Sequence, residues 1–359
     1  MKRLMVVTML LSVVLLTFAA GNVFAAVKGA CVTCHTMHNS QDGATVTTSG
    51  VPVEALLNEA SCFACHTGTN TGLVAGVMNG TGIPYVYNTS EPAYPGTATV
   101  SPSLAGGNFY WVQTDDATGH NVEGVKAKDV TLDNEPPGWD AGYNLNGALN
   151  NSLATWGTTR LTCAGTNGCH GVHTTDEQFG AVRGAHHLVD TTIDGSTVGN
   201  SYRFLIGIVG NEDDDWEYTK TAADHNQYKG TSDTVDKSTI SYLCAECHGQ
   251  FHTAGSTNGE NGTAPWLRHP TDLDMNTLAA GTEYKSYTTY DPIVPVASTD
   301  VSVVKSAINA VAGDAIVTCV SCHRAHGSPY ADLLRWDYDL MVAGNSNTTG
   351  CFVCHTTKN

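Results

Sequence analysis

Apolar and polar residues follow one another without a regular period along most of this 359-residue chain. The exception is its start, where Met1-Lys2-Arg3 precede an apolar run that reaches Phe18, and small residues surround Ala25. A basic end, an apolar run of this length and small residues before a cleavage point are typical of a secretory signal peptide. We expect residues 1–25 to be removed, which places the rest outside the cytoplasm. An uncleaved membrane anchor is the alternative.

Beyond residue 25 the pattern predicts few regular elements. Gly, Thr, Asn and Pro fill the long intervals, and neither a 3.6-residue nor a 2-residue period is sustained. We expect a short helix over residues 53–60 and strands over residues 108–113 and 202–209. Alternating apolar residues over 334–340 predict another strand, although Ser328-Pro329 could instead cap a helix there. The prediction is a single, mostly irregular domain over residues 26–359.

Twelve cysteines in a secreted chain would ordinarily indicate six disulfides. Here they form six close pairs, and a histidine directly follows the second cysteine of each pair. The pairs and their histidines are Cys31/Cys34 with His35, Cys62/Cys65 with His66, Cys163/Cys169 with His170, Cys244/Cys247 with His248, Cys319/Cys322 with His323 and Cys351/Cys354 with His355. Neither disulfides nor zinc sites need a histidine after every pair. The pattern indicates six c-type haems, each held by two thioethers, with the histidine as proximal iron ligand.

The third pair departs from this spacing, because five residues instead of two separate Cys163 from Cys169. Asn167-Gly168 is a strong turn signal, and a turn there would loop out the extra residues and keep both sulfurs within reach of one haem. A single thioether at this site is the alternative. About one haem for every 56 residues would let porphyrin faces replace much of the usual hydrophobic core.

The charge of the chain is strongly acidic. Its 34 acidic residues face only 17 basic ones, of which Lys2 and Arg3 belong to the predicted signal peptide. A net negative charge of this size disfavours nucleic acid as a partner. We expect the acidic run over residues 212–215 to be a solvated loop and not a cation site.

Nine histidines remain after the six proximal ones, and they are the candidates for distal iron ligands. They are His38, His120, His173, His186, His187, His225, His252, His269 and His326. Four of them, at positions 38, 173, 252 and 326, follow a proximal histidine by three or four residues. On a helical turn such pairs lie about 5–6 Å apart at Cβ, so each pair could ligate two neighbouring haems.

Methionine is the other common distal ligand, but none of the methionines after the signal peptide stands in a repeated context. Ligation by two histidines is therefore favoured, and it lowers the haem potential. Two protein ligands close the iron to substrate, and no Cys-x-x-Cys-Lys motif occurs in the chain. We interpret the protein as an electron-transfer protein and not an enzyme, with a reductase as the disfavoured alternative.

Several stretches combine haem motifs with the surroundings of the spare histidines. They are residues 34–40, 119–121, 267–270, 319–326 and 351–355. In this order they resemble the extracellular hexahaem c-type cytochromes that polymerise into filaments in metal-reducing bacteria, and the resemblance covers the whole mature chain. It implies a mostly irregular fold with few short helices and strands, wrapped around a continuous chain of six haems.

The same resemblance implies a ligand set and an assembly. The implied distal ligands are His38, His120, His173, His252, His269 and His326, which leaves His186, His187 and His225 as spares. His38 would ligate the fifth haem of the next subunit, so that chains join head to tail and pass electrons to external acceptors such as metal oxides, electrodes or partner cells. Upstream periplasmic or outer-membrane cytochromes would supply the electrons. A monomeric periplasmic shuttle is the alternative.

Overall fold

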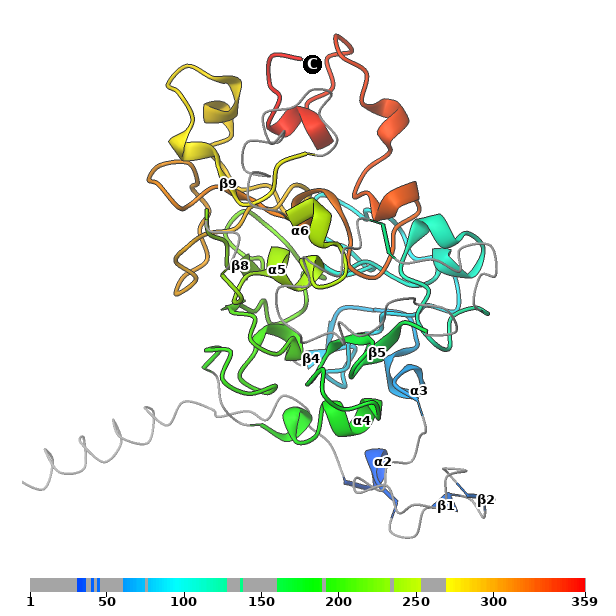
Figure 1. Ribbon diagram of the computed structural model, residues 1–359. Coiled ribbons are helices and arrows are strands. Elements are labelled where there is room, and N and C mark those ends of the chain that lie inside the picture. The colour runs from blue at the N-terminus through cyan, green and yellow to red at the C-terminus, as the bar shows by residue number, and fades with distance from the viewer. Residues whose placement is uncertain are drawn as a thin grey trace, which may run out of the picture.

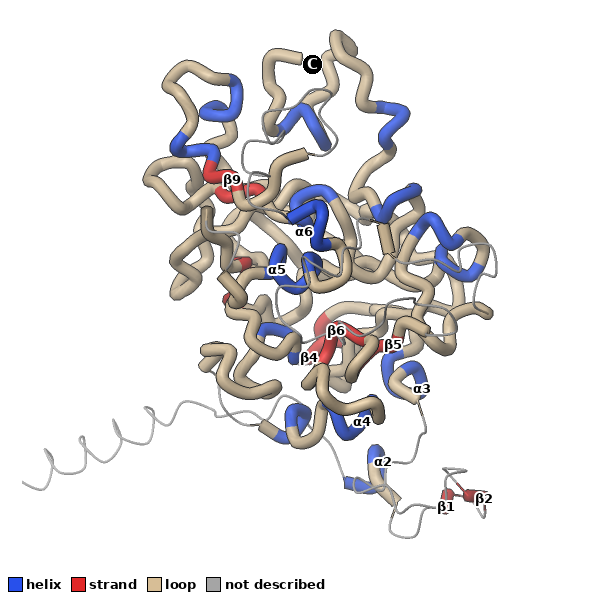
Figure 2. The backbone as a smooth tube through the Cα atoms, viewed as in Figure 1, coloured by secondary structure: helices blue, strands red, loops and turns tan. Residues whose placement is uncertain are grey.

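Loops and turns make up most of the chain in the computed structural model, and helices and strands are short (Figures 1 and 2). The structure describes residues 31–36, 40–41, 44–45, 61–74, 77–127, 136–137, 160–188, 192–232, 236–252 and 269–358. The predicted fold class, a mostly irregular chain with few short elements, is confirmed. The predicted signal peptide and the helix over residues 53–60 lie outside the described residues.

The α-helices of the described residues span one or two turns each. They are α2 (Cys31–Cys34), α3 (Phe63–His66), α4 (Gln178–Ala181), α5 (Ile240–Ala245) and α6 (Cys319–Cys322). Single 3₁₀ turns are more numerous. They are Trp111–Gln113, Asp116–Thr118, Ala185–His187, Tyr202–Phe204, Gly249–His252, Met275–Thr277, Glu283–Ser286, Ala331–Leu333, Tyr338–Leu340 and Gly350–Val353. No described helix is long and apolar enough to cross a membrane.

The strands pair two by two and form no larger sheet among the described residues. The antiparallel pairs are β1 (Ser40–Gln41) with β2 (Ala44–Thr45), β3 (Leu73–Val74) with β4 (Val77–Met78), β7 (Gly210–Asn211) with β8 (Gln227–Tyr228), and β9 (Leu273–Asp274) with β10 (Ile316–Val317). The parallel pair is β5 (Thr162–Ala164) with β6 (Gly168–His170), in the register Thr162 to Gly168 and Ala164 to His170.

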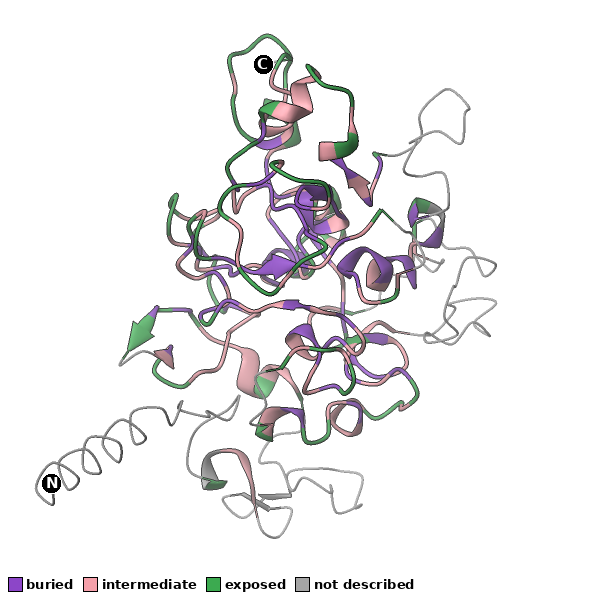
Figure 3. Cartoon of the chain, turned by 90° about the vertical axis from the view of Figure 1, so that its left-hand side faces the viewer, coloured by how far each residue is buried: buried purple, intermediate pink, exposed green. Residues whose placement is uncertain are grey.

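Buried apolar residues gather in three small clusters instead of one core, and Figure 3 shows buried segments threaded between exposed loops. The first cluster is Tyr202, Leu205, Ile208, Tyr228, Ile240, Ala297, Ile316 and Val320. The second is Met275, Tyr287, Tyr290, Val296, Ile308, Ala315 and Val317, and the third is Phe109, Val112 and Val122.

The predicted strands over residues 108–113 and 202–209 are wrong. The Asn108 side chain accepts hydrogen bonds from the N–H groups of Asn88 and Tyr110, which turns the chain into the 3₁₀ helix Trp111–Gln113. Residues 202–209 begin with a 3₁₀ turn in which Arg203 has a φ of 49°. At both places the apolar residues are spaced as in a strand, but they lie in turns of the chain instead of in an extended segment.

Residues 334–340 form neither the predicted strand nor the alternative helix. Trp336 is buried, whereas Tyr338 and Leu340 are 68% and 61% exposed, so the alternating residues do not share one buried face. The Asp337 side chain caps the 3₁₀ turn Tyr338–Leu340 by accepting from the N–H of Asp339.

The acidic run over residues 212–215 also differs from the expected solvated loop, because Asp213 and Asp215 are buried.

Candidate haem-binding sites

Five of the six Cys-Cys-His motifs share one backbone feature. The N–H of the histidine donates to the carbonyl of the first cysteine, closing a single α-helical turn with N···O distances of 2.8 to 3.1 Å. The bonds are His35 to Cys31, His66 to Cys62, His248 to Cys244, His323 to Cys319 and His355 to Cys351. Such a turn places cysteines three positions apart on one face of the backbone, as two thioethers to one porphyrin require.

The second cysteine of a motif can be held by the same turn. In the second motif the Cys65 N–H donates to the Cys62 carbonyl at 3.2 Å, and Cys65 is only partly buried. The Cys354 N–H donates to the Cys351 carbonyl at 3.3 Å in the sixth motif. The structure describes all twelve cysteines, and none of them forms the disulfide that a secreted chain would ordinarily contain. The thioether role of each cysteine, with Cys34 and Cys65 as the second thiols of the first two motifs, stays a prediction.

The third motif contains a turn between two short strands in place of the helical turn of the other five. Its five intervening residues are the last residue of β5, a turn over residues 165–167 and the first residue of β6, and the Thr162 N–H donates to the Asn167 carbonyl at 2.9 Å. Gly165 has a φ of +90°, and a Cβ at Gly168 would lie 2.5 Å from the Ala164 nitrogen, so both positions need glycine. The turn predicted from Asn167-Gly168 is present. That both Cys163 and Cys169 bind the haem stays a prediction.

Five of the proximal histidines each have a second histidine ring opposite them. The ring centroids are separated by 5.8 Å for His35 and His187, 6.5 Å for His66 and His186, 6.4 Å for His170 and His326, 6.2 Å for His248 and His120, and 6.1 Å for His355 and His269. Two imidazoles that ligate one metal from opposite sides, with bonds of about 2 Å, have ring centroids roughly 6 Å apart. The spacing therefore fits an iron between each pair.

Hydrogen bonds orient five of these ten rings, and also the ring of His323, through the Nδ1 atom. Nδ1 faces a backbone carbonyl in His66 (Pro84, 2.9 Å), His170 (Arg203, 2.9 Å), His248 (Pro137, 2.6 Å), His323 (Asp332, 2.6 Å), His120 (Ala325, 2.7 Å) and His269 (Pro270, 3.1 Å). A carbonyl acceptor fixes the proton on Nδ1, which leaves the Nε2 lone pair free for a metal. This repeated tautomer is the one that an iron ligand requires.

Burial favours the neutral, metal-binding form in several of the paired imidazoles. Burial, with nearby histidines adding to it, lowers the pKa of His186 and His248 to about 4 and that of His326 to about 3. A ring with so low a pKa is uncharged at neutral pH, and a neutral imidazole is the metal-binding species.

A crossing of glycines sets the positions of His120 and His326. Gly327 bridges both Gly107 and Gly119, and the His120 N–H donates to the His326 carbonyl at 3.1 Å. A Cβ at Gly119 would lie 2.4 Å from Val112 Cγ2 and 2.5 Å from the His326 carbonyl oxygen. Close backbone contact of this kind is open only to glycine, so the crossing fixes two imidazoles at once.

His173 and His252, which were expected to be distal ligands, lie against carboxylates instead. His173 Nδ1 is 3.3 Å from Glu246 Oε2, and its Nε2 is 3.2 Å from the Cys169 carbonyl oxygen. The buried His252 forms an ion pair through Nε2 with Asp272. In both rings Nε2, the atom that would face an iron, already has a partner. The structure brings neither of them opposite a proximal histidine.

Two histidines that were expected to be spares lie opposite proximal histidines instead. His186 and His187, expected to be spares, lie opposite His66 and His35, while His225 stacks on Tyr290 at 3.4 Å and stays a spare. The signal that could have identified the first two is their adjacency: in the 3₁₀ turn Ala185–His187, successive side chains point in different directions and can serve two metals. No described histidine lies opposite His323, and His38 is outside the described residues.

Successive motifs lie next to one another in space. The side chain of Cys62 lies close enough to that of Cys163 to interact with it, and the same holds for Cys244 and Cys319. Cys169 interacts electrostatically with Cys247, and Cys322 with Cys354. In Figure 1 the motifs rise in sequence order from α2 through α3, β5, α5 and α6 to the C-terminal turn. The second to sixth sites thus form one connected row.

A direct contact explains how the fourth and fifth motifs are held together. The Ser241 and Thr318 hydroxyls are hydrogen bonded at 2.7 Å, joining α5 to the start of α6. Thr318 and Ser321 also cap α6 reciprocally.

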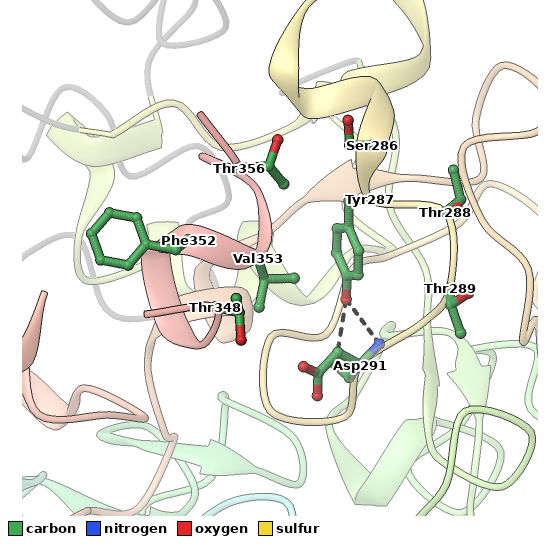
Figure 4. A pocket seen from close by; sticks show the side chains of 9 residues that line it. All are labelled: Ser286, Tyr287, Thr288, Thr289, Asp291, Thr348, Phe352, Val353 and Thr356. Carbon is green, nitrogen blue, oxygen red and sulfur yellow. Dashed lines mark hydrogen bonds between the residues drawn. The ribbon is translucent and has the colours of Figure 1, made fainter. Parts of the chain in front are cut away.

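The sixth motif borders a pocket of about 290 Å³ between residues 286–291 and 348–356 (Figure 4). The Tyr287 hydroxyl lies at its edge, where it accepts from the Asp291 N–H at 3.0 Å and donates to the Val294 carbonyl at 2.6 Å. Phe352 and Val353 of the motif line the opposite side.

Comparisons with known proteins agree with this reading of the motifs. A family model described as "Doubled CXXCH motif" matches residues 309–359, which hold the fifth and sixth sites. The motif and the relative below support binding of c-type haem, as in the class of multihaem c-type cytochromes. The chain is 23% identical to the C-type cytochrome OmcS of Geobacter sulfurreducens over an alignment of 423 residues, covering 100% of this chain and 91% of that protein. The resemblance predicted from the sequence is confirmed.

Two solved structures are also similar to this chain. One is described as "Cryo-EM of the OmcS nanowires from Geobacter sulfurreducens", with a TM-score of 0.42 and 18% identity over 86% of this chain and 84% of that one. The other is "Outer Membrane Cytochrome S Filament from Geobacter Sulfurreducens", with a TM-score of 0.40 and 19% identity over 88% of this chain and 85% of that one.

Proposed function

We propose that this chain binds six c-type haems and transfers electrons outside the cell as a subunit of a head-to-tail filament. The observation that carries the proposal is the set of five opposed histidine pairs, each roughly 6 Å across, along motifs that adjoin in sequence order. Bound haems would supply reversible one-electron chemistry at iron. The protein supplies two thiols and two imidazoles per site and sets the spacing between sites.

The ligand set that we propose follows these pairs and revises the one implied by the resemblance. The proximal ligands and all twelve cysteines stay as expected. The distal ligands are His187 for the first haem, His186 for the second, His326 for the third, His120 for the fourth, His38 of a neighbouring subunit for the fifth and His269 for the sixth. Two imidazoles on each iron leave no coordination position for substrate, which supports electron transfer over catalysis.

The proposal of a filament depends on the fifth haem site. His323 is oriented by the Asp332 carbonyl like the other proximal histidines, yet no described histidine lies opposite it. His38 follows α2, and Figure 1 places α2 at the lower end of the chain and α6 in its upper half, with α3, α4 and β5 between them. A residue from the lower end of one copy would reach the fifth site of the next. A contact between two different surfaces that does not close into a ring produces a fibre.

Localisation and partners complete the proposal. Residues 1–25 would direct secretion and be removed, and residues 26–359 would form the six-haem domain. Electrons would arrive from periplasmic or outer-membrane cytochromes and leave to extracellular acceptors, both of which act at haem edges and need no dedicated catalytic site.

The substitution His38→Ala tests the filament. The thioether motif at Cys31 is unchanged, so six haems should still be attached, but the fifth iron should lose its second imidazole and filaments should be absent or much shorter under the electron microscope. His225→Ala is the matched control, since that ring lies opposite no proximal histidine. If His38→Ala forms normal filaments with every haem low-spin, the head-to-tail contact is wrong. A wild-type protein that is monomeric by size-exclusion chromatography would favour the periplasmic shuttle.

A further inference from the structure

Two of the proximal histidines are each held at two points by one short turn. At the third motif, the His170 ring donates from Nδ1 to the Arg203 carbonyl at 2.9 Å. The N–H of the next residue, Gly171, donates to the Phe204 carbonyl at 2.8 Å. Two successive carbonyls therefore bind the imidazole and the backbone beside it, and we call a turn with both contacts a carbonyl clamp.

The fifth motif contains a second carbonyl clamp. The His323 ring donates from Nδ1 to the Asp332 carbonyl at 2.6 Å. The N–H of the next residue, Arg324, donates to the Leu333 carbonyl at 2.7 Å. In both clamps the first carbonyl of the turn binds the ring and the second binds the N–H of the residue after the histidine.

The two clamps occur in different surroundings. Gly171 pairs in parallel with Leu205, whereas His323 pairs antiparallel with Leu334. The chain therefore passes the histidine in opposite directions at the two motifs. Because the same two contacts are nevertheless made, they are a property of the turn and not of one local topology.

Both clamps depend on a backbone conformation that their residues rarely adopt. The φ angles are 49° at Arg203, 61° at Phe204, 58° at Asp332 and 59° at Leu333. Two successive residues with positive φ form a type I′ turn, in which glycine and asparagine are the common residues. Arginine, phenylalanine and leucine have a Cβ that disfavours this conformation, so other contacts must hold it.

Arg203 makes several of these contacts itself. Its N–H donates to Glu212 Oε1, and its Nη2 donates to the Asp213 carbonyl, both at 2.5 Å. Nη2 also donates to Asn226 Oδ1 at 2.8 Å. Backbone and side chain of Arg203 are thus fixed on the side away from the histidine, which holds its carbonyl toward His170.

A third turn of this kind has a different partner. Trp216 and Glu217 have φ angles of 59° and 61°, and the Trp216 carbonyl accepts from the N–H of Ala105 at 2.9 Å. A left-handed turn is therefore not in itself a histidine contact. What distinguishes the two clamps is the imidazole on the first carbonyl.

We propose that Arg203 and Asp332 are positioning residues, whose left-handed turns fix the rings of His170 and His323 and so set the potentials of the third and fifth haems. A carbonyl acceptor keeps the proton on Nδ1 and makes the imidazole a stronger donor to a metal. A stronger donor favours oxidised iron, so each clamp should lower the potential of its haem. The proposal rests on the proposed function, because a potential needs an attached haem.

Asp332 gives the first test because its side chain is exposed. Asp332→Val is compared with Asp332→Gly and Asp332→Asn. All three remove the same negative charge, but only the β-branched valine resists a positive φ. By spectroelectrochemistry and electron paramagnetic resonance, about one sixth of the haem in Asp332→Val should have a higher potential than in the other two, or become high-spin.

The third haem is tested by the same comparison at Arg203. Arg203→Val and Arg203→Gly both lose the guanidinium contacts, and only valine resists the turn, so the potential should be higher in the valine variant. The control is Ser346, an exposed residue with a φ of 57° in the loop after Leu340. Ser346→Val and Ser346→Gly should have the same potentials.

Two results would overturn the proposal. One is equal potentials and low-spin spectra for the valine and glycine variants at both clamps. The other is a shift of the same size for Ser346→Val, which would assign the effect to a general loosening of the chain. Where a valine variant does not fold, the alanine variant replaces it, since any Cβ disfavours the turn. Haem content, measured by the pyridine haemochrome spectrum, separates the two levels: a wild-type protein without haem refutes the proposed function, whereas six haems with equal potentials refute the clamps alone.

Discussion

The substitution His186→Ala separates the ligand set built from the structure from the one implied by sequence spacing. The His186 ring lies 6.5 Å from that of His66, and burial with the neighbouring histidines holds its pKa at about 4, so it is neutral and suited to bind metal. If it ligates the second iron, its loss opens one site in six. About one sixth of the haem should become high-spin or water-bound and should bind about one carbon monoxide per chain.

The assay is a carbon monoxide titration of the reduced protein, followed by the change in the Soret band. The control is His225→Ala, which removes a ring that is 1% exposed and stacked on Tyr290. The control should cost about 2–4 kcal/mol of folding stability without opening any iron. If His186→Ala stays fully low-spin and binds no carbon monoxide, the assignment is wrong. Carbon monoxide binding by His173→Ala would instead restore the ligand implied by the resemblance.

Three further predictions concern the surroundings of the sites. Gly119→Ala should cost about 1–3 kcal/mol and add a high-spin signal in electron paramagnetic resonance, because its Cβ would displace the backbone of His326. Burial lowers the pKa of His252, but the bond to Asp272 outweighs it and the net shift is upward. That pair should therefore stabilise the fold fully below pH of about 6.5 and lose its contribution as pH rises through the raised pKa, so the difference between wild type and Asp272→Asn in urea unfolding should shrink at alkaline pH. Alkylation of the denatured haem-loaded protein should label no cysteine, Cys65 and Cys163 included.

Each of these has a clear contrary outcome. An unchanged spectrum and stability for Gly119→Ala would show that the glycine crossing is not needed to hold the two imidazoles. A difference between wild type and Asp272→Asn that grows with pH would mean that His252 is not charged in the pair. Labelling of Cys163 would favour a single thioether at the third site, and labelling of Cys65 would contradict the two-thioether attachment of the second haem.

The motifs could be predicted from the sequence because their chemistry is local. A cysteine pair and the histidine after it close one helical turn, and five of the six motifs contain the same bond from the histidine N–H to the first cysteine. The pairing of a proximal histidine with a second histidine is not local. His173 and His252 follow proximal histidines at helical spacing, but the chain turns after the motif, and each ring meets a carboxylate that is far away in the sequence or on another element.

The predictions for His326 and for residues 202–209 were also limited by contacts between distant parts of the chain. His326 lies at the same spacing as His173, yet it lies opposite His170 because Gly107, Gly119 and Gly327 cross beside it. Three-dimensional contacts of this kind leave no periodic trace in the sequence. The predicted strand over residues 202–209 was wrong because apolar residues in turns can be spaced as they are in strands.

The most direct measurement is a density map of the secreted protein at a resolution that shows side chains. Our account predicts six porphyrins in sequence order, with His187 and His186 on the first and second irons and His38 of the neighbouring subunit on the fifth. An iron bound by His173 or His252, or a fifth iron whose two ligands come from the same chain, would contradict it.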